Sequence, residues 1–274
     1  MNIKLLALDM DGTTLKSDSV TVSPANRTAI EAAAARGILV VTATGRMRHR
    51  LPEAIEQMPE PHYAVTCNGA AVFDLRKEAP LYANPIPGET ALRVFDRLAP
   101  YPVFIEIYSG GFDYVERDRI PHLEAAGFSE SRMKNLLRGR RTVDSQREYL
   151  LHPTAPIEKF NVPYLPPACQ EAIWAEMRAV EGVSLTSSVA HNIEINAAGA
   201  NKGDGLRFLC GYLGIAPEEV MAVGDNRNDL EMLTFAGLAA APANATDEIK
   251  AIADWVGPSS EDDCVARAIE RFLL

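Results

Sequence analysis

The sequence lacks closely spaced cysteines, long apolar runs and an excess of basic charge. None of its four cysteines, Cys67, Cys169, Cys210 and Cys264, has C-x-x-C spacing, so neither a zinc knuckle nor a redox pair is indicated. Scattered single cysteines are typical of a reducing compartment. No stretch approaches the ~20 apolar residues of a membrane span. The first apolar run is too short for a signal peptide because Asp9 interrupts it. We therefore expect a cytoplasmic protein with no membrane partner.

The charge balance bears on the kind of ligand. The formal net charge is −10, whereas binding to duplex nucleic acid depends on a basic surface, so we expect no nucleic-acid partner. A small phosphorylated metabolite needs only a local positive site, and the acidity does not argue against one. The 274 residues, of which 47% are hydrophobic, are typical of a soluble globular protein with one or two domains. The oligomeric state is left open.

Both ends of the chain alternate strand and helix patterns. Residues 3–8, 38–41 and 220–223 are short apolar runs that predict buried strands. A helix is predicted to begin at Pro24 and to end at Gly37, and another helix is expected after Arg46. Strands that alternate with helices in this way indicate a parallel α/β sheet.

The middle of the chain has a different pattern. Strand-like residues 103–108 and 112–116 flank a Gly-Gly turn, and helical stretches lie between such hairpins. Hairpins of this kind indicate an α+β unit on an antiparallel sheet. We therefore predict a core domain built from residues 1–83 and 191–274, with a second domain, residues 84–190, inserted into it.

The first predicted strand ends in Asp9-Met10-Asp11-Gly12-Thr13. In an open α/β sheet, ligands bind beyond the carboxyl ends of the strands. Because residues i and i+2 of an extended chain point the same way, the Asp9 and Asp11 carboxylates can reach one ligand. Two close carboxylates repel unless a cation or proton intervenes, and Mg²⁺ prefers oxygen ligands and often bridges to a phosphate. The alternative is a plain Asp-Gly turn after a strand.

Three further polar groups stand at strand ends or helix starts. Asp225 follows a strand as Asp9 does, and it could complete a metal site. The hydroxyl of Thr44 and nearby backbone N–H groups could hold a phosphate, and Lys202 could supply positive charge. Taken alone, the Asp225 segment has the alternative of helix capping by Asn228, Thr44 is better explained as a simple cap, and a lone lysine is usually solvated surface. Together they supply the nucleophile, proton carrier, metal ligands and phosphate-binding groups that phosphoryl transfer needs.

These residues resemble, in order, the four motifs of the haloacid dehalogenase superfamily. The matching segments are Asp9-x-Asp11-Gly12-Thr13, Thr44 before Gly45-Arg46, Lys202, and Gly224-Asp225-x-x-Asn228-Asp229. Asn68-Gly69-Ala70 resembles a segment of the Cof-type (class IIB) branch of capped phosphatases. One departure is Thr14, where these proteins often have leucine, but it lies outside the reacting atoms. The resemblance covers nearly the whole chain. It implies a Rossmann-like parallel-sheet core with an inserted α+β cap domain of the C2B type.

The resemblance also implies an activity, that of a Mg²⁺-dependent phosphatase. Asp9 would attack phosphorus and become an aspartyl-phosphate, while Asp11 would protonate the leaving alcohol and then activate water. The carboxylates of Asp9 and Asp225 and the backbone carbonyl of Asp11 would hold Mg²⁺. Phosphate oxygens would be bound by the side chains of Thr44, Lys202 and Asn228 and by the backbone N–H groups of Met10 and Gly45. Asp229 would orient its neighbours.

The substrate is not legible in the sequence. Sugar phosphates are the leading class by resemblance, followed by phosphorylated cofactors, and we expect residues 84–190 to choose among them because every motif residue lies elsewhere. Two other readings stay open. A phosphomutase would return the phosphoryl group to a sugar, and a non-catalytic phospho-receiver would keep it on the aspartate.

Overall fold

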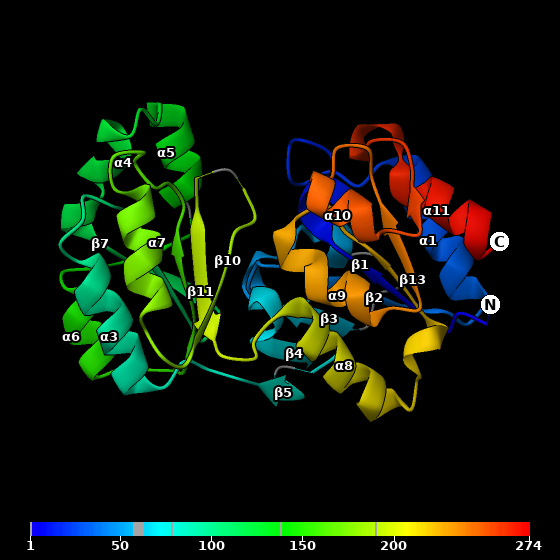
Figure 1. The fold of residues 1–274 in the computed structure, drawn as a ribbon, viewed down its shortest axis with the longest axis horizontal. Helices are drawn as coiled ribbons and strands as arrows, with labels where there is room; N and C mark the ends of the chain where they lie inside the picture. Colours follow the sequence, from blue (N-terminus) through cyan, green and yellow to red (C-terminus); the bar gives the residue numbers. More distant parts are fainter. Residues whose placement is uncertain (1, 57–62, 78, 138, 190) are drawn as a thin grey trace. The chain divides into compact units, whose positions relative to one another are not determined.

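The computed structural model describes residues 2–56, 63–77, 79–137, 139–189 and 191–274 (Figure 1). The chain forms two compact units: a core unit, Met1–Ala83 with Ala200–Leu274, and an inserted unit, Asn84–Gly199. The sequence-based return to the core at residue 191 differs from this division. The reason is that the strand Ile193–Ala197 pairs with strands of the inserted unit's sheet, not with the core.

The core unit contains an eight-stranded sheet in the order β14-β13-β12-β1-β2-β3-β4-β5. Strands β14 to β3 in this order run parallel, and β4 and β5 are antiparallel to their neighbours. The strands are β1 (Leu5–Leu8), β2 (Leu39–Ala43), β3 (Tyr63–Thr66), β4 (Ala71–Asp74), β5 (Tyr82–Ala83), β12 (Val220–Val223), β13 (Leu238–Ala241) and β14 (Trp255–Val256). Strand β1 therefore lies between β12 and β2, which come from opposite ends of the chain.

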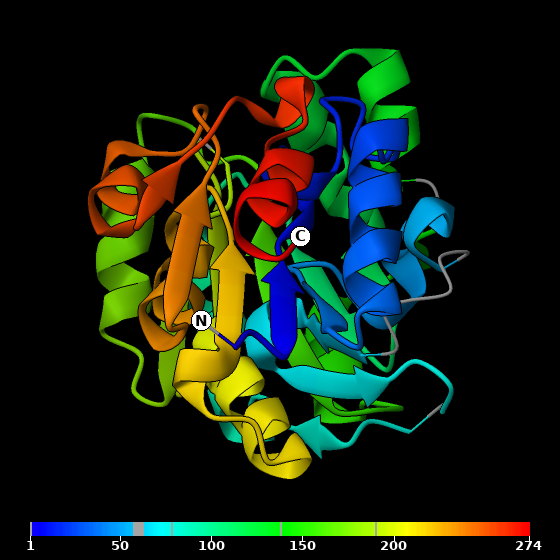
Figure 2. The same cartoon turned by 90° about the vertical axis from the view of Figure 1, so that its right-hand side faces the viewer.

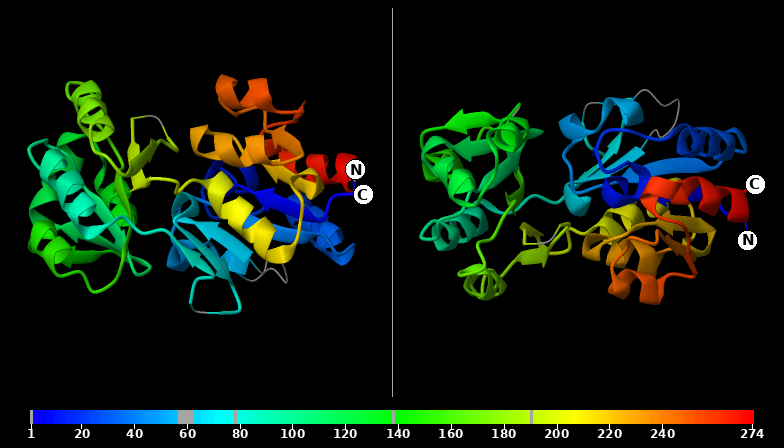
Figure 3. Two further views of the ribbon diagram at one scale, coloured as in Figure 1. Left: turned by 60° about the horizontal axis from the view of Figure 1, so that its bottom comes forward. Right: turned by 90° about the horizontal axis from the view of Figure 1, so that it is seen from above.

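Helices cover both faces of this sheet because its central strands are apolar on both sides. Leu6 and Leu8 of β1 pack in one cluster with Ile30, whereas Leu5 packs in another with Leu206. The first face carries α1 (Pro24–Ala35), which contacts α11 (Cys264–Phe272), and the short α2 (Glu53–Glu56) (Figure 2). The second face carries α8 (Lys202–Leu213), α9 (Leu230–Phe235) and α10 (Asp247–Ile252) (Figure 3).

Local signals explain where the core helices begin. The Ser23 hydroxyl accepts the Asn26 N–H (3.1 Å) one residue before Pro24, which confirms the predicted start of α1. In the described residues, the helix expected after Arg46 is interrupted: a single turn, Arg48–Arg50, is followed by α2, which is described up to Glu56. Pro52 explains this difference, because proline has no N–H with which a helix could continue through it.

The inserted unit is an α+β structure on a six-stranded sheet in the order β10-β11-β9-β6-β7-β8. All neighbours are antiparallel except β7 and β8. Its strands are β6 (Glu106–Ser109), β7 (Phe112–Glu116), β8 (Arg141–Val143), β9 (Ile157–Val162), β10 (Val183–Thr186) and β11 (Ile193–Ala197). Its helices are α3 (Gly88–Leu98), α4 (Pro121–Ala125), α5 (Glu130–Leu137), α6 (Gln146–Leu151) and α7 (Gln170–Arg178), and α3 contacts both α6 and α7.

The two faces of this sheet differ in polarity. Phe160 pairs with Ile107 on one side and Ile195 on the other, which makes an apolar row across three strands. Successive side chains alternate between faces, so the neighbouring row is polar: Asn161 pairs with both Glu106 and Glu194. We call the residues on this side, Glu106, Tyr108, Lys159, Asn161 and Glu194, the polar face.

The structure also bears on a membrane role. In the described ranges, none of the helices combines the length and apolar character that crossing a bilayer requires.

Candidate active site

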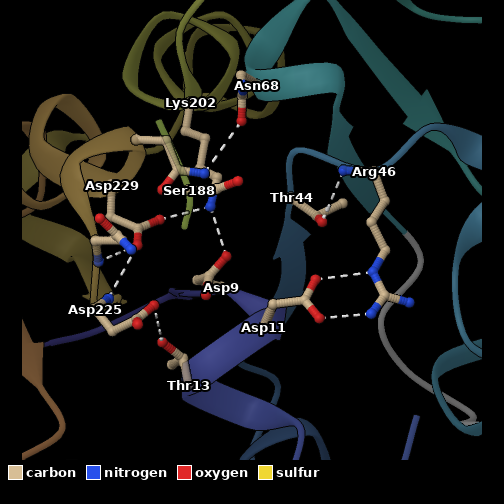
Figure 4. Close-up of polar contacts among 12 residues, drawn as sticks. Asp9, Asp11, Thr13, Thr44, Arg46, Asn68, Ser188, Lys202, Asp225 and Asp229 are labelled. Carbon is tan, nitrogen blue, oxygen red and sulfur yellow. Dashed lines mark hydrogen bonds and ion pairs between the residues drawn. The ribbon is translucent and has the colours of Figure 1, made fainter. Parts of the chain in front are cut away.

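The candidate site lies at the carboxyl edge of the core sheet, where three adjacent strands end. Leu8 at the end of β1 pairs with Val223 of β12 and with Thr42 of β2. The next residues of these strands, Asp9, Gly224-Asp225 and Thr44, therefore come together, as the sequence predicts for a parallel sheet (Figure 4). The Asp9 N–H donates to the Val223 carbonyl (3.0 Å), which fixes the start of the first loop.

Lys202 joins two carboxylates at the centre of the site. Its Nζ lies 2.5 Å from Asp9 Oδ1 and 2.6 Å from Asp229 Oδ1, and the lysine side chain is completely buried. Burial alone would favour the neutral amine, but the charges of Asp229 and Asp9 raise the lysine pKa above its usual value. The Asn201 side chain accepts the Asp204 N–H (2.8 Å), so α8 begins at Lys202 and directs it to this position.

Asp229 shapes the loop that carries Asp225. Its Oδ2 accepts the backbone N–H groups of Asp225 (2.9 Å) and Asn226 (3.0 Å), while its Oδ1 bonds Lys202. A Cβ on Gly224 would lie 2.6 Å from the Asp229 Cβ, so only glycine fits there. Both oxygens of Asp229 are thus engaged with protein groups, which fits an orienting role better than that of a metal ligand.

The carboxylates of Asp9 and Asp225, with the charge of Asp229 beside them, fit a divalent cation. Oxygens of Asp9, Asp225 and Asp229 lie within 4.8 Å of one another. Burial, followed by the charge of Asp229, raises the pKa of Asp9 well above its ordinary value, and the same two causes raise the pKa of Asp225 to about 7. The buried Oδ2 of Asp9 has no hydrogen-bond partner among the described residues. Three carboxylates facing one ammonium leave negative charge that a divalent cation would neutralise.

Gly12 lets these carboxylates approach. Its backbone is left-handed (φ +81°), and a Cβ there would lie 2.4 Å from Asp225 Oδ2. The next residue, Thr13, donates its hydroxyl to Asp225 Oδ1 (3.2 Å). The Asp-Gly-Thr part of the first motif therefore positions Asp225, a contact that spacing within the motif could not predict.

Asp11 points away from this cluster and pairs with Arg46. Arg46 donates Nε to Asp11 Oδ2 (2.8 Å) and Nη2 to Oδ1 (2.5 Å), and Nη2 also donates to the Ser19 carbonyl (2.7 Å) (Figure 4). Such a bidentate pair fixes a carboxylate in position as well as in charge. The sequence placed Arg46 beside Thr44 but assigned it no role. The spacing of residues along the chain could not reveal the pair, because it joins two separate loops.

The remaining predicted residues lie in the loops around this centre. The buried Thr44 accepts the Arg46 N–H at its hydroxyl (3.1 Å). Asn228 donates its amide to Asn68 Oδ1 (3.3 Å), which brings in a residue that the sequence had noted only within a family segment. Met10 and Gly45 lie two residues beyond the ends of β1 and β2, and their contribution of N–H groups to phosphate binding stays a prediction.

Known proteins resemble the chain over its full length. The sequence model of the haloacid dehalogenase-like hydrolase family matches residues 6–269 of this chain. The phosphatase YwpJ of Bacillus subtilis is 30% identical over 99% of this chain and 100% of that protein. The 5-amino-6-(5-phospho-D-ribitylamino)uracil phosphatase YcsE of the same organism is 29% identical over 100% of this chain and 97% of that protein. A solved haloacid dehalogenase-like hydrolase from B. subtilis is 28% identical, with a TM-score of 0.85 over 99% of this chain and 100% of that one.

The fold comparison and the family match agree with the motif residues gathered at the sheet edge. The chain belongs to the haloacid dehalogenase-like hydrolase family, and it is a phosphatase.

Proposed function

We propose that this phosphatase depends on Mg²⁺ and hydrolyses small phosphate monoesters through an aspartyl-phosphate on Asp9. The state of the Asp9 carboxylate carries the proposal. One oxygen is held by Lys202, whereas the other is buried without a hydrogen-bond partner among the described residues. Burying a carboxylate oxygen without a partner is costly. The buried Asp9 oxygen at the end of β1 is explained if it binds a substrate or a metal ion.

In the first half of the reaction, an Asp9 oxygen forms a bond to phosphorus while the bond from phosphorus to the ester oxygen breaks. The leaving alkoxide takes a proton from Asp11. Lys202 offsets negative charge on the phosphoryl oxygens, and the Thr44 hydroxyl and Asn228 amide donate hydrogen bonds to them. The products are a free alcohol and an aspartyl-phosphate.

In the second half, Asp11 takes a proton from water, and the water oxygen attacks phosphorus. The bond to Asp9 breaks, which releases inorganic phosphate and restores the carboxylate. The ion pair with Arg46 suits the ionised Asp11 that this half requires. To donate a proton in the first half, Asp11 has to leave Arg46.

The carboxylates of Asp9 and Asp225 and the backbone carbonyl of Asp11 are the groups that would hold Mg²⁺. When bound, the cation supplies positive charge that offsets the phosphoryl oxygens as the Asp9 carboxylate approaches. We choose Mg²⁺ because hard carboxylate oxygens are its preferred protein ligands.

The proposed substrates are sugar phosphates or phosphorylated cofactors and their precursors. Three relatives from B. subtilis, 28–29% identical over 98–100% of this chain, are named as phosphatases of 5-amino-6-(5-phospho-D-ribitylamino)uracil. That compound carries a phosphorylated sugar-alcohol chain. The polar face of the inserted unit, where Asn161 donates to Glu106 (2.5 Å) and Lys159 pairs with Glu194 (3.2 Å), suits hydroxyl groups of such a chain. We propose that this face selects the alcohol part of the ester.

The test is to incubate the purified protein with a panel of phosphate monoesters and Mg²⁺, and to measure inorganic phosphate and free alcohol together. We expect equal amounts of both, with activity lost in excess chelator and restored by Mg²⁺. The matched control is Asp247→Asn, which changes a fully exposed aspartate of the core unit and should leave turnover unchanged.

Other outcomes would replace the proposal. Recovery of an isomeric sugar phosphate without inorganic phosphate would identify a phosphomutase. A phosphoaspartate that persists for hours without turnover would identify a phospho-receiver. Full activity in chelator after removal of bound metal would exclude the Mg²⁺ requirement.

A further inference from the structure

The loop after β3 contains three consecutive residues in the left-handed region. Cys67 has φ 48°, Asn68 has φ 53° and ψ 38°, and Gly69 has φ 90°. The first two are completely or almost completely buried. Left-handed backbone is unfavourable for residues that carry a Cβ, most of all for one such as cysteine with no side-chain amide to compensate. A cost of this kind persists only where the surroundings impose it, and it often marks a functional segment.

The backbone of this turn holds the loop that carries Thr44. The Cys67 N–H donates to the Arg46 carbonyl (2.8 Å), and the Asn68 N–H donates to the Thr44 carbonyl (3.0 Å). The left-handed conformation points successive N–H groups toward this one loop. Thr44 is bonded from the other side as well, since its own N–H donates to the Val65 carbonyl (2.8 Å). The turn therefore helps to fix the backbone of Thr44, and with it the position of the Thr44 hydroxyl.

The same turn sets the start of α8. A Cβ on Gly69 would lie 2.0 Å from the Asn201 carbonyl oxygen, so backbone packs directly on backbone at this point. A Cβ on Gly205 would lie 3.1 Å from the Gly69 Cα, which leaves no room for a side chain between the turn and the first turn of the helix. Asn201 caps α8, and Lys202 is the first residue of that helix. The contact of the turn with Asn201 therefore fixes the position of Lys202 relative to Thr44.

The third contact is made by the side chain of Asn68. Its Oδ1 accepts a hydrogen from the Asn228 amide nitrogen (3.3 Å). In this bond the Asn228 amide nitrogen is the donor, and the same nitrogen carries a second hydrogen for a phosphate oxygen. An Asn228 side chain turned the other way would present a carbonyl oxygen, which repels phosphate.

We infer that the Cys67–Gly69 turn is a positioning element that aligns the three phosphate-binding groups Thr44, Lys202 and Asn228, with Asn68 acting through Asn228. This inference rests on the proposed function, because it takes those three groups as the phosphate site. Asn68 is a positioning residue and does not itself need to touch the substrate.

The test measures the inhibition constant of inorganic phosphate, together with kcat and KM for p-nitrophenyl phosphate, in Mg²⁺. Asn68→Gly keeps the left-handed backbone and removes the carboxamide. We expect it to melt near the wild-type temperature but to bind phosphate about fivefold more weakly, as for the loss of one hydrogen bond. In an Asn228→Ala background the same change should have no further effect, because coupled residues are not additive.

Gly69→Ala tests the backbone contact. It should lower kcat by about 100-fold, since a displacement of about 1 Å in a catalytic group has an effect of that size. Gly37→Ala is the matched control, because Gly37 is also left-handed (φ +82°) but a Cβ there meets nothing within 4 Å. This control should lower the melting temperature without changing kcat or phosphate affinity.

Two results would overturn the inference. One is an Asn68→Gly protein whose phosphate affinity and kcat/KM stay within twofold of the wild-type values. The other is an equal loss from Asn68→Gly with and without Asn228, which would show that Asn68 acts independently. Both differ from failure of the proposed function, in which the wild-type protein itself would release no phosphate from any ester.

Discussion

Replacing Asp225 by asparagine should make the metal-free protein more stable and inactive. The pKa of Asp225 is raised from an ordinary 3.8 to about 7, first by burial and then by the charge of Asp229. A difference of about 3 pH units corresponds to roughly 4 kcal/mol at 1.36 kcal/mol per unit. Ionising this carboxyl in the folded protein above pH 7 therefore opposes folding by up to that amount, and asparagine removes the cost. Thr13 can still donate to the asparagine carbonyl oxygen.

The difference in stability between Asp225→Asn and the wild-type protein should depend on pH. A carboxyl whose folded pKa is raised holds its proton more tightly in the folded state, so its contribution to stability is complete below about pH 4 and is lost as pH rises through about 7. The excess stability of Asp225→Asn should thus increase from pH 5 to pH 8 and level off above about pH 7. Even one quarter of 4 kcal/mol would raise the melting temperature by about 2–4 °C.

The assay is thermal unfolding in chelator from pH 5 to pH 8, followed by the same series with Mg²⁺. Mg²⁺ should stabilise the wild-type protein, by about 2.7 kcal/mol at 100 times its dissociation constant, but not the variant. Asp247→Asn serves as the exposed control, with no change at any pH. A variant that is less stable than the wild-type protein at pH 8 in chelator would refute the electrostatic reasoning.

Three further outcomes are expected. Asp9→Asn should fold but lose about a thousandfold or more in turnover, because the amide cannot attack phosphorus; retention of a tenth of the activity would exclude Asp9 as nucleophile. Arg46→Ala should lower kcat for alkyl phosphates and p-nitrophenyl phosphate by similar factors, because the ion pair suits the ionised Asp11 of the second half, which both substrates share; a loss confined to alkyl phosphates would contradict this. Asn161→Ala, which removes one hydrogen bond to Glu106, should change KM among sugar phosphates but spare p-nitrophenyl phosphate, as kinetics on both substrates would test.

Much of the site followed from the sequence because parallel strands end at one edge. Asp9 and Asp225 each follow a short apolar strand, and adjacent strands bring such residues together whatever their separation along the chain. The ion pair of Arg46 with Asp11 did not follow, since it depends on how a long side chain crosses between two loops. The left-handed backbone conformation of Cys67 also could not be predicted from the sequence. Asn68-Gly69 predicts a turn, but no local preference of cysteine predicts its backbone.

The boundary at residue 191 illustrates a second limit. Residues 193–195, Ile-Glu-Ile, predict a short strand but do not indicate to which sheet it belongs. The sheet to which a strand belongs is decided by the strands with which it pairs. Strand β11 pairs with β9 and β10 of the inserted unit. Register and sheet membership are properties of the pairing, which a single segment does not encode.

The position of β1 has a consequence for synthesis of the protein. Its strand partners are β2, made soon afterwards, and β12, made only when the ribosome has passed the whole inserted unit. At about 5–20 residues per second, one edge of β1 waits on the order of ten seconds or more before Val220–Val223 arrives to cover it. During this time Asp9 has no Asp225 or Lys202 beside it, so the nascent chain carries an open apolar edge and no phosphatase centre. Such an edge invites pairing with other chains, and we expect this interval, not the finished molecule, to be the stage most in need of a chaperone.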